Sequence, residues 1–164
     1  GEVKVAGHRD AESKPWRIGI ETPRDGPQQS QHVLPLEDIA VATSGDYRNY
    51  FEHDGKRYSH TLDPRTGRPI DHRLASVTVI HRSDAWADAW ATALMVLGEE
   101  EGMALALERS LPVLMLVRQE AGWTSRASPA FVDHFGSDIV DQLDVSVVDK
   151  AATDMAADVK RPLE

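Results

Sequence analysis

The sequence predicts an α+β protein in which a mainly antiparallel sheet packs against one central, largely apolar helix and a second, shorter helix. Three observations lead to this class. Short segments of alternating polar and apolar residues recur in the first half of the chain, separated by turn-forming Gly, Pro and Asp. Residues 84–97 have the composition of a long apolar helix. Residues 112–118 form a near-continuous apolar run, which is typical of a central strand.

The N-terminal quarter is predicted to contain three strands. Alternation of polar and apolar residues predicts strands around residues 3–5 and over residues 16–21. Residues 22–32 are rich in Pro, Gly and Gln and are expected to form a loop. Residues 39–43 are apolar and predict a short buried strand, which ends at the polar residues 44–46.

The middle of the chain is predicted to contain a hairpin, a turn and a longer strand. An Asp-Gly pair separates residues 47–51 from residues 56–60 and is typical of a two-residue hairpin turn. Residues 63–69 are rich in turn-forming residues. Residues 74–81 contain Val and Ile in the pattern of a strand.

Two consecutive helices are predicted next. Ser83 is a suitable N-cap, and Asp84 places a negative charge in the first turn, where it suits the helix dipole. Gly98 is expected to end the first helix. Residues 99–109 are expected to form the second helix.

The C-terminal part of the chain is less strongly patterned. The regions around Trp123 and Phe131 are expected to be short strands or connecting loops. Residues 1–136 are interpreted as the main domain and residues 137–164 as an acidic segment that is weakly structured or forms a short helix. Within that segment, residues 151–164 are expected to form a mobile tail or a short helix.

Composition narrows the class of protein and its partners. The chain has 164 residues, 41% of them hydrophobic and 27% charged, which is typical of an ordinary globular protein. The formal charge of −9 argues against a nucleic-acid or anionic-membrane partner. The chain has no Cys, so disulfides and thiolate metal sites are excluded. No apolar run approaches the length of a membrane span, and no signal peptide opens the chain. The chain begins within an apparent strand, so an N-terminal part is expected to be missing.

Asp88 and Thr92 are the candidate metal ligands. They lie four residues apart in the apolar helical segment and therefore share one face. A carboxylate with a hydroxyl is a hard oxygen pair, which Mg²⁺ prefers when phosphates complete its coordination. Ala and Trp surround Asp88, and a carboxylate in such a setting needs a partner. The alternative is that Asp88 lies on the wet face of the helix and that Thr92 has no specific role.

His60 is the candidate catalytic residue. It directly precedes the turn-rich residues 63–69, and a histidine can take a proton from a hydroxyl near neutral pH. Beside a metal site this suggests chemistry on a phosphate ester or anhydride. The alternative is that His60 is polar surface. Ser44, Gly45 and Asp46 close a buried strand, and Gly45 allows a ligand to approach the backbone; the alternative there is a simple strand-end turn.

Taken together, these motifs resemble the FAD:protein FMN transferases, also called the ApbE family. The resemblance covers roughly residues 1–118. The segments that carry it are residues 1–3 (GEV), 15–21 (PWRIGIE), 43–51 (TSGDYRNYF), 58–70 (YSHTLDPRTGRPI), 75–79 (ASVTV) and 87–98 (ADAWATALMVLG).

The resemblance implies an enzyme that binds FAD and Mg²⁺, cleaves the pyrophosphate with release of AMP, and joins FMN through a phosphoester bond to a Thr of a target protein. It implies that Asp88 and Thr92 hold the metal and that His60 deprotonates the acceptor hydroxyl. A periplasmic location is also implied. The residues that it implies for the flavin nucleotide site are Thr43, Ser44, Gly45 and Asp46.

The family's members are about twice as long as this chain, and their other half carries a Gly-rich, Lys-containing segment that contributes to FAD and metal binding. Residues 1–136 are therefore interpreted as the C-terminal half of a larger two-part ApbE-like fold, with the missing N-terminal half or a second copy of the chain as partner. Two alternative functions remain open. One is a divalent-metal FAD pyrophosphatase without an acceptor, and the other is a non-catalytic flavin-binding accessory fragment. An interaction module without a ligand would leave Asp88 unexplained.

Overall fold

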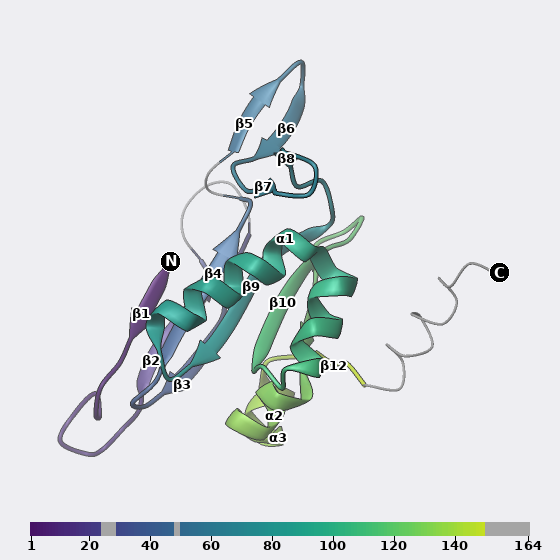
Figure 1. Cartoon of the computed structure of the whole chain (residues 1–164). Coiled ribbons are helices and arrows are strands. Elements are labelled where there is room, and N and C mark those ends of the chain that lie inside the picture. Colours follow the sequence, from purple (N-terminus) through teal and green to yellow (C-terminus); the bar gives the residue numbers. More distant parts are fainter. Residues whose placement is uncertain (24–28, 48–49, 150–164) are drawn as a thin grey trace.

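A six-stranded sheet forms the centre of the protein (Figure 1). The computed structural model describes residues 1–23, 29–47 and 50–149. The strand order is β1-β4-β9-β10-β11-β12, and neighbouring strands are antiparallel except for the parallel pair of β11 and β12. The strands of this sheet are β1 (Glu2–Lys4), β4 (Ala40–Gly45), β9 (Leu74–His81), β10 (Val113–Arg118), β11 (Trp123–Ala127) and β12 (Ser146–Val147). The mainly antiparallel α+β class is confirmed.

Helix α1 (Asp84–Glu108) covers one face of this sheet and packs on β4 and β9. At Gly98 its backbone leaves the helical region, with φ 84° and ψ −173°. The prediction of two helices that meet at Gly98 is therefore confirmed, and Figure 1 shows the change of direction between them. The His72 ring packs against Gly98, where an added Cβ would lie 2.9 Å from the ring, and His72 Nε2 donates to the Met95 carbonyl at 2.9 Å.

The opposite face of the sheet is covered by a separate hairpin of β2 (Trp16–Glu21) and β3 (Ser30–Leu36). The two layers follow from the alternation of side chains along the strands. In β4, Ala40 and Ala42 face the core beneath α1, whereas Val41 faces the core beneath the hairpin. Both cores are mainly apolar, with Ser76 and Thr78 of β9 as fully buried polar exceptions.

The expected loop over residues 22–32 is wrong at its C-terminal end, because β3 begins at Ser30. His32, Leu34 and Leu36 alternate as buried residues against the sheet. Pro35 obscured this strand in the sequence. It is tolerated because β3 pairs only with β2 within its two-stranded sheet, so a Pro can occupy its free side.

Two small hairpins project from the end of the sheet at which β4 ends (Figure 1). The first pairs β5 (Tyr50–His53) with β6 (Lys56–Ser59). Its turn residues Asp54 and Gly55 have φ values of 50° and 71°. Positive φ at both positions is what a type I′ turn requires, and the Asp-Gly prediction is confirmed. The second hairpin pairs β7 (Leu62–Asp63) with β8 (Arg68–Pro69).

The region around Phe131 is a helix rather than a strand or loop, which corrects the sequence prediction. Helix α2 spans Pro129–Phe135, and Pro occupies its first turn. The Ser128 hydroxyl caps it by accepting a hydrogen bond from the Phe131 N–H at 3.3 Å. Phe131 is fully buried beneath the sheet.

Helix α3 (Ser137–Gln142) follows α2 and leads to β12. The expected tail over residues 151–164 lies outside the described residues. Within the described ranges, none of the helices combines the length and the apolar character that crossing a membrane would require.

Candidate functional site

A cleft of about 560 Å³ lies where β4 ends beside the first half of α1. Residues of β1, β2, β4, α1 and the segment that follows β6 line it. Its polar lining includes Glu21, Thr43, Ser44, His60, Asp88 and Thr92. The cleft therefore brings together six of the seven site residues that the motifs and the family resemblance indicated, and Gly45 is one of them.

Asp88 and Thr92 both face this cleft from α1, one helical turn apart. Both residues are exposed, so the expectation that the surrounding Ala and Trp embed the Asp88 carboxylate is wrong, because this face of the helix is open to the cleft. Ser44 Oγ at the end of β4 lies 3.2 Å from Thr92 Oγ1. A carboxylate and two hydroxyls from two elements therefore open onto one space.

The donor set fits a hard divalent cation that takes most of its ligands from elsewhere. Across residues 1–23, 29–47 and 50–149, no group of three or more His, Cys, Asp or Glu side chains is arranged to hold a metal ion. One carboxylate with hydroxyls is sparse ligation. Such a set suits Mg²⁺ when substrate phosphates and water complete the octahedron. It does not suit a closed structural zinc site.

The end of β4 forms the floor of the cleft, and its geometry depends on a glycine. Thr43 Oγ1 lies 2.8 Å from Thr78 Oγ1 on β9, which fixes that side chain. At Gly45, an added Cβ would lie 2.4 Å from the Tyr47 ring and 3.1 Å from the Ala75 carbonyl oxygen. Any side chain at this position would displace these neighbours, so Gly45 allows the Tyr47 ring to pack closely against the strand end.

Asp46 is the one predicted site residue that is not among the lining residues of the cleft. Its carboxylate instead accepts hydrogen bonds from Arg118, with Nη1 to Oδ2 at 2.6 Å and a second bond from Nη2 to Oδ1. Sequence spacing did not reveal this pairing, because the two residues lie 72 positions apart.

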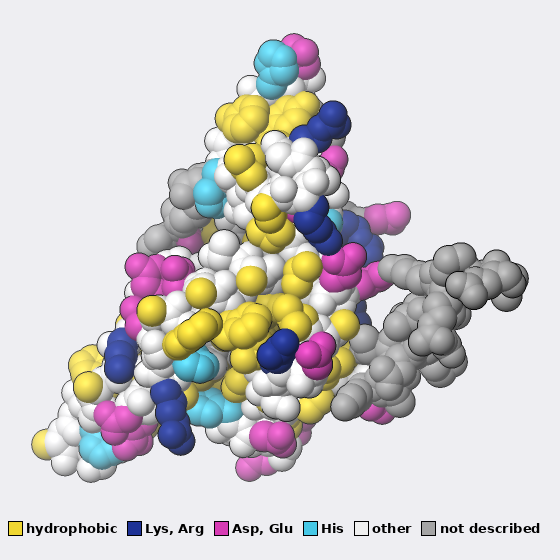
Figure 2. Space-filling view, in the orientation of Figure 1, with side chains coloured by type: hydrophobic (Ala, Val, Ile, Leu, Met, Phe, Trp, Pro, Cys, Tyr) yellow, Lys and Arg dark blue, Asp and Glu magenta, His cyan; other side chains and the backbone are white. Residues whose placement is uncertain are grey.

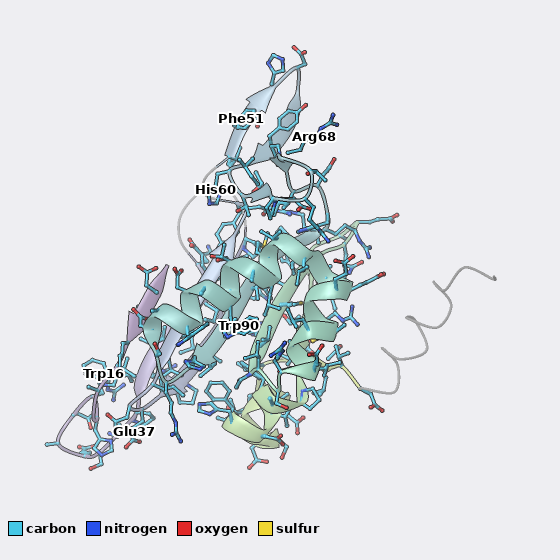
Figure 3. The ribbon with its side chains drawn as sticks, viewed as in Figure 1. Trp16, Glu37, Phe51, His60, Arg68 and Trp90 are labelled. Atoms are coloured by element: carbon cyan, nitrogen blue, oxygen red, sulfur yellow. The ribbon has the colours of Figure 1, made fainter. Side chains whose placement is uncertain are left out.

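His60 directly follows β6 and lines the cleft together with Thr61. Figure 3 shows His60 at the base of the β5–β6 hairpin, beside the end of β4. The preceding residue is buried, and its hydroxyl, Ser59 Oγ, accepts a hydrogen bond from the Thr61 N–H at 3.1 Å. His60 is exposed where it lines the cleft.

Ion pairs of Arg65 connect the turn that follows His60 to helix α1. Arg65 donates to Asp63 through Nη2 at 2.8 Å and to Glu101 on the second half of α1 through Nη1 at 3.0 Å. The hydrogen bonds from Arg65 hold the pKa of Asp63 below its ordinary value, and the same bonds raise the pKa of Arg65. The segment that carries His60 is therefore anchored to the helix that carries Asp88.

Several lining residues had no role in the sequence prediction. Val3 of β1 and Ile18, Ile20 and Glu21 of β2 form one wall of the cleft. Their strands were predicted, but the pairing of β1 with β4 and the packing of β2 beside the main sheet bring them to the site. Periodicity contains no signal for that placement.

The structure is that of an α+β protein whose cleft is lined by hydroxyl and carboxylate groups and lies between the end of β4 and one face of α1. Residues 1–115 match the model of the ApbE family. The chain belongs to the ApbE family, and the resemblance stated from its motifs is confirmed.

Curated relatives and solved structures agree with this assignment. An FAD:protein FMN transferase of Vibrio cholerae is 52% identical over 132 residues, which are 80% of this chain and 39% of that protein. One from Klebsiella pneumoniae is 44% identical over 131 residues, covering 80% and 37% of the two proteins. The apo crystal structure of the Pseudomonas stutzeri flavinyl transferase ApbE superposes with a TM-score of 0.70 at 48% identity, over 84% of this chain and 42% of that one. An ApbE protein of Thermotoga maritima gives a TM-score of 0.68 at 35% identity, over 82% and 42%. The chain therefore spans about two fifths of the length of these relatives.

Proposed function

We propose that this chain forms part of the site of a Mg²⁺-dependent FAD:protein FMN transferase, which attaches FMN to a Thr of a target protein and releases AMP. The observation that carries the proposal is the meeting of Asp88, Thr92, Ser44 and His60 in one cleft, although they come from α1, β4 and the segment after β6. Relatives named FAD:protein FMN transferase, 52% and 44% identical to the chain over the matched residues, support it.

In this proposal the Asp88 carboxylate and the Thr92 hydroxyl hold the metal. When bound, Mg²⁺ supplies charge neutralisation on the pyrophosphate oxygens. The contact between Ser44 and Thr92 keeps the end of β4 beside these ligands. Gly45 and Tyr47 line the cleft beside these ligands, where a nucleotide phosphate can lie.

His60 acts as the general base. It takes the proton of the acceptor Thr hydroxyl, whose own pKa is far too high for ionisation near neutral pH. The hydroxyl oxygen forms a bond to the phosphorus of the FMN moiety, the bond from that phosphorus to the bridging oxygen breaks, and AMP leaves with that oxygen. Apolar lining residues such as Val3 and Ile18 provide surface for the flavin ring.

The test is to graft this chain in place of its matched region in the Vibrio cholerae relative. The graft is given FAD, Mg²⁺ and an acceptor protein, and covalent flavin is followed by its fluorescence on a denaturing gel. We expect transfer, with mass spectrometry locating FMN on a Thr. Release of FMN and AMP without labelled acceptor would support the pyrophosphatase alternative. Flavin binding without either reaction would support the accessory-fragment alternative.

The periplasmic location rests on the family resemblance and stays a prediction.

A further inference from the structure

We infer that Asp46 and Arg118 form a positioning pair that holds the end of β4 in the shape that lines the cleft. The inference rests on the proposed function, since it takes the cleft to be the flavin nucleotide site. The two guanidinium nitrogens of Arg118 each donate to one carboxylate oxygen of Asp46. This two-pronged geometry fixes direction as well as distance. The side chains are only 16% and 29% exposed, so water competes weakly for the contact.

Arg118 is itself held in place. It is the last residue of β10, and its backbone N–H donates to the Arg73 carbonyl at 2.9 Å. Its guanidinium carbon lies 5.8 Å from the centre of the Trp123 ring, within the range of a cation–π contact. Since β9 lies between β4 and β10 in the sheet, the pair connects the cleft-lining strand end to the middle of the sheet.

The turn that Asp46 occupies has little freedom to absorb a change. The Asp46 N–H donates to the Ala75 carbonyl at 3.2 Å, and the Tyr47 ring closes over Gly45. Gly45 and Tyr47 both line the cleft, whereas Asp46 between them does not. A shift of the Asp46 carboxylate therefore moves a lining residue on each side of it.

This assignment differs from the role that the family resemblance implied for Asp46. If Asp46 touched the flavin nucleotide directly, changes at Arg118 would matter little and would add to changes at Asp46. If the two residues act as a pair, either change breaks the same contact, and the second change adds almost nothing.

The variants that separate these cases are Asp46→Asn, Arg118→Lys and the double variant. Asn keeps the shape of Asp without its charge, and Lys keeps the charge of Arg without its planar fork. The first measurement is amide hydrogen exchange on the 164-residue chain without flavin. We expect the Asp46 and Tyr47 amides to exchange about tenfold faster in each single variant and equally fast in the double variant.

The second measurement uses the graft and varies FAD at saturating acceptor. We expect the KM for FAD to rise about tenfold in each variant, because small misplacements of binding groups weaken a site strongly. We expect kcat to change less than threefold at saturating FAD, roughly within assay scatter for a positioning role. A purely structural role would lower the unfolding temperature without raising the KM.

The matched control is the ion pair of Arg126 and Glu99, which joins β11 to α1 at similar exposure, 34% and 17%. Neither residue lines the cleft. Arg126→Lys should leave both the exchange at Asp46 and the KM for FAD unchanged.

Unchanged exchange at Asp46 and Tyr47 in the variants would overturn the inference. So would a KM that rises for Asp46→Asn alone and not for Arg118→Lys, since that result makes Asp46 a direct ligand. Failure of the proposed function looks different. The unaltered graft would then neither bind nor transfer flavin, while hydrogen exchange would still decide whether the pair holds the turn.

Discussion

Asp88 is exposed on a helix whose neighbouring positions are mostly Ala and Trp, and it faces a cleft with Thr92 one turn away. A carboxylate without a metal role in this position could be removed with little effect. We expect Asp88→Ala in the graft to lower Mg²⁺-dependent transfer by about 10²-fold or more, because a bound metal contributes several kcal/mol of charge stabilisation. Initial rates at several Mg²⁺ concentrations measure this.

The control for Asp88 is Glu108→Ala, an exposed carboxylate at the far end of the same helix. Its removal should leave the rate unchanged. A rate for Asp88→Ala equal to that of the control would remove Asp88 from the metal site.

His60 gives a second prediction for a single residue. A general base contributes about 10²- to 10⁴-fold, so His60→Ala should lose transfer by that factor while FAD still binds. Covalent labelling of the acceptor measures the first effect, and flavin fluorescence measures the second. His53→Ala is the matched control, because His53 lies on the same hairpin and is 74% exposed at its tip. A loss of less than tenfold for His60→Ala would argue against a base.

Single residues were predictable where one element decides their placement. Asp88 and Thr92 share a helix face because of their spacing alone, and the structure brings both to one cleft. Asp46 was not predictable in this way. The direction of its side chain depends on Arg118, and no local pattern links a strand-end turn to a strand 72 positions later.

Among the elements, the β2–β3 hairpin packs on the main sheet through an apolar core and also through a buried histidine. His32 Nε2 lies 2.8 Å from Ser125 Oγ on β11, and His32 is only 6% exposed. Burial disfavours the charged ring and lowers the pKa of His32 below its ordinary value of 6.5, while the Asp144 carboxylate opposes this effect. The hairpin therefore packs best with His32 neutral.

This shift gives a direction for the pH dependence of stability. The folded pKa of His32 is lower than the unfolded one, so the unfolded chain binds the proton more readily below pH 6.5. The contribution of neutral His32 is complete above that pH and is lost as the pH falls toward the folded pKa. We expect the unfolding temperature to drop between pH 7 and pH 5, and to drop less in His32→Gln.

Unfolding temperatures measured by circular dichroism between pH 7 and pH 5 give the slope of stability against pH. His134, whose pKa is also lowered by burial, leaves part of the slope in the variant. His53→Gln, at the exposed hairpin tip, should behave like the unaltered chain. An identical slope for His32→Gln and the unaltered chain would show that His32 does not titrate with folding.

Elements were predicted well where local chemistry determines them. The Asp-Gly pair defines a turn with positive φ at both residues, and Gly98 allows a break that an L side chain would strain. Strand β3 was missed because its partner β2 and the buried faces of β4 and β9 select it, in spite of Pro35. Helix α2 did carry a local signal, namely Ser128 followed by Pro129, which is a cap and first-turn pattern.

On the scale of the whole molecule, the chain exposes large apolar side chains beside its candidate site. Trp86 on α1 is 58% exposed and stacks on Trp90, with ring centres 6.5 Å apart. Figure 2 shows hydrophobic side chains gathered over this helix. Val3, which lines the cleft on β1, is 43% exposed. Since the chain spans about two fifths of the length of its relatives, its apolar surfaces are places where further polypeptide can pack.

The share of its relatives' length that the chain spans leads to a prediction of how tightly it binds FAD by itself. The cleft offers a strand end, two candidate metal ligands and one apolar wall. The family resemblance assigns a Gly-rich flavin segment to the half of family members that this chain does not match. A dinucleotide held on one side retains much of its hydration and gains little free energy. We expect a Kd for FAD weaker than about 1 μM for the isolated chain, which corresponds to less than about 8.2 kcal/mol of binding free energy.

The graft should bind FAD at least tenfold more tightly than the isolated chain. Titrations of both proteins with FAD and Mg²⁺, followed by flavin fluorescence, measure the difference, and Thr92→Val in the graft tests whether the metal ligands contribute to it. Equal affinities, or micromolar or tighter binding by the isolated chain, would mean that these residues alone build the flavin site and that the remainder of a full-length relative serves another purpose.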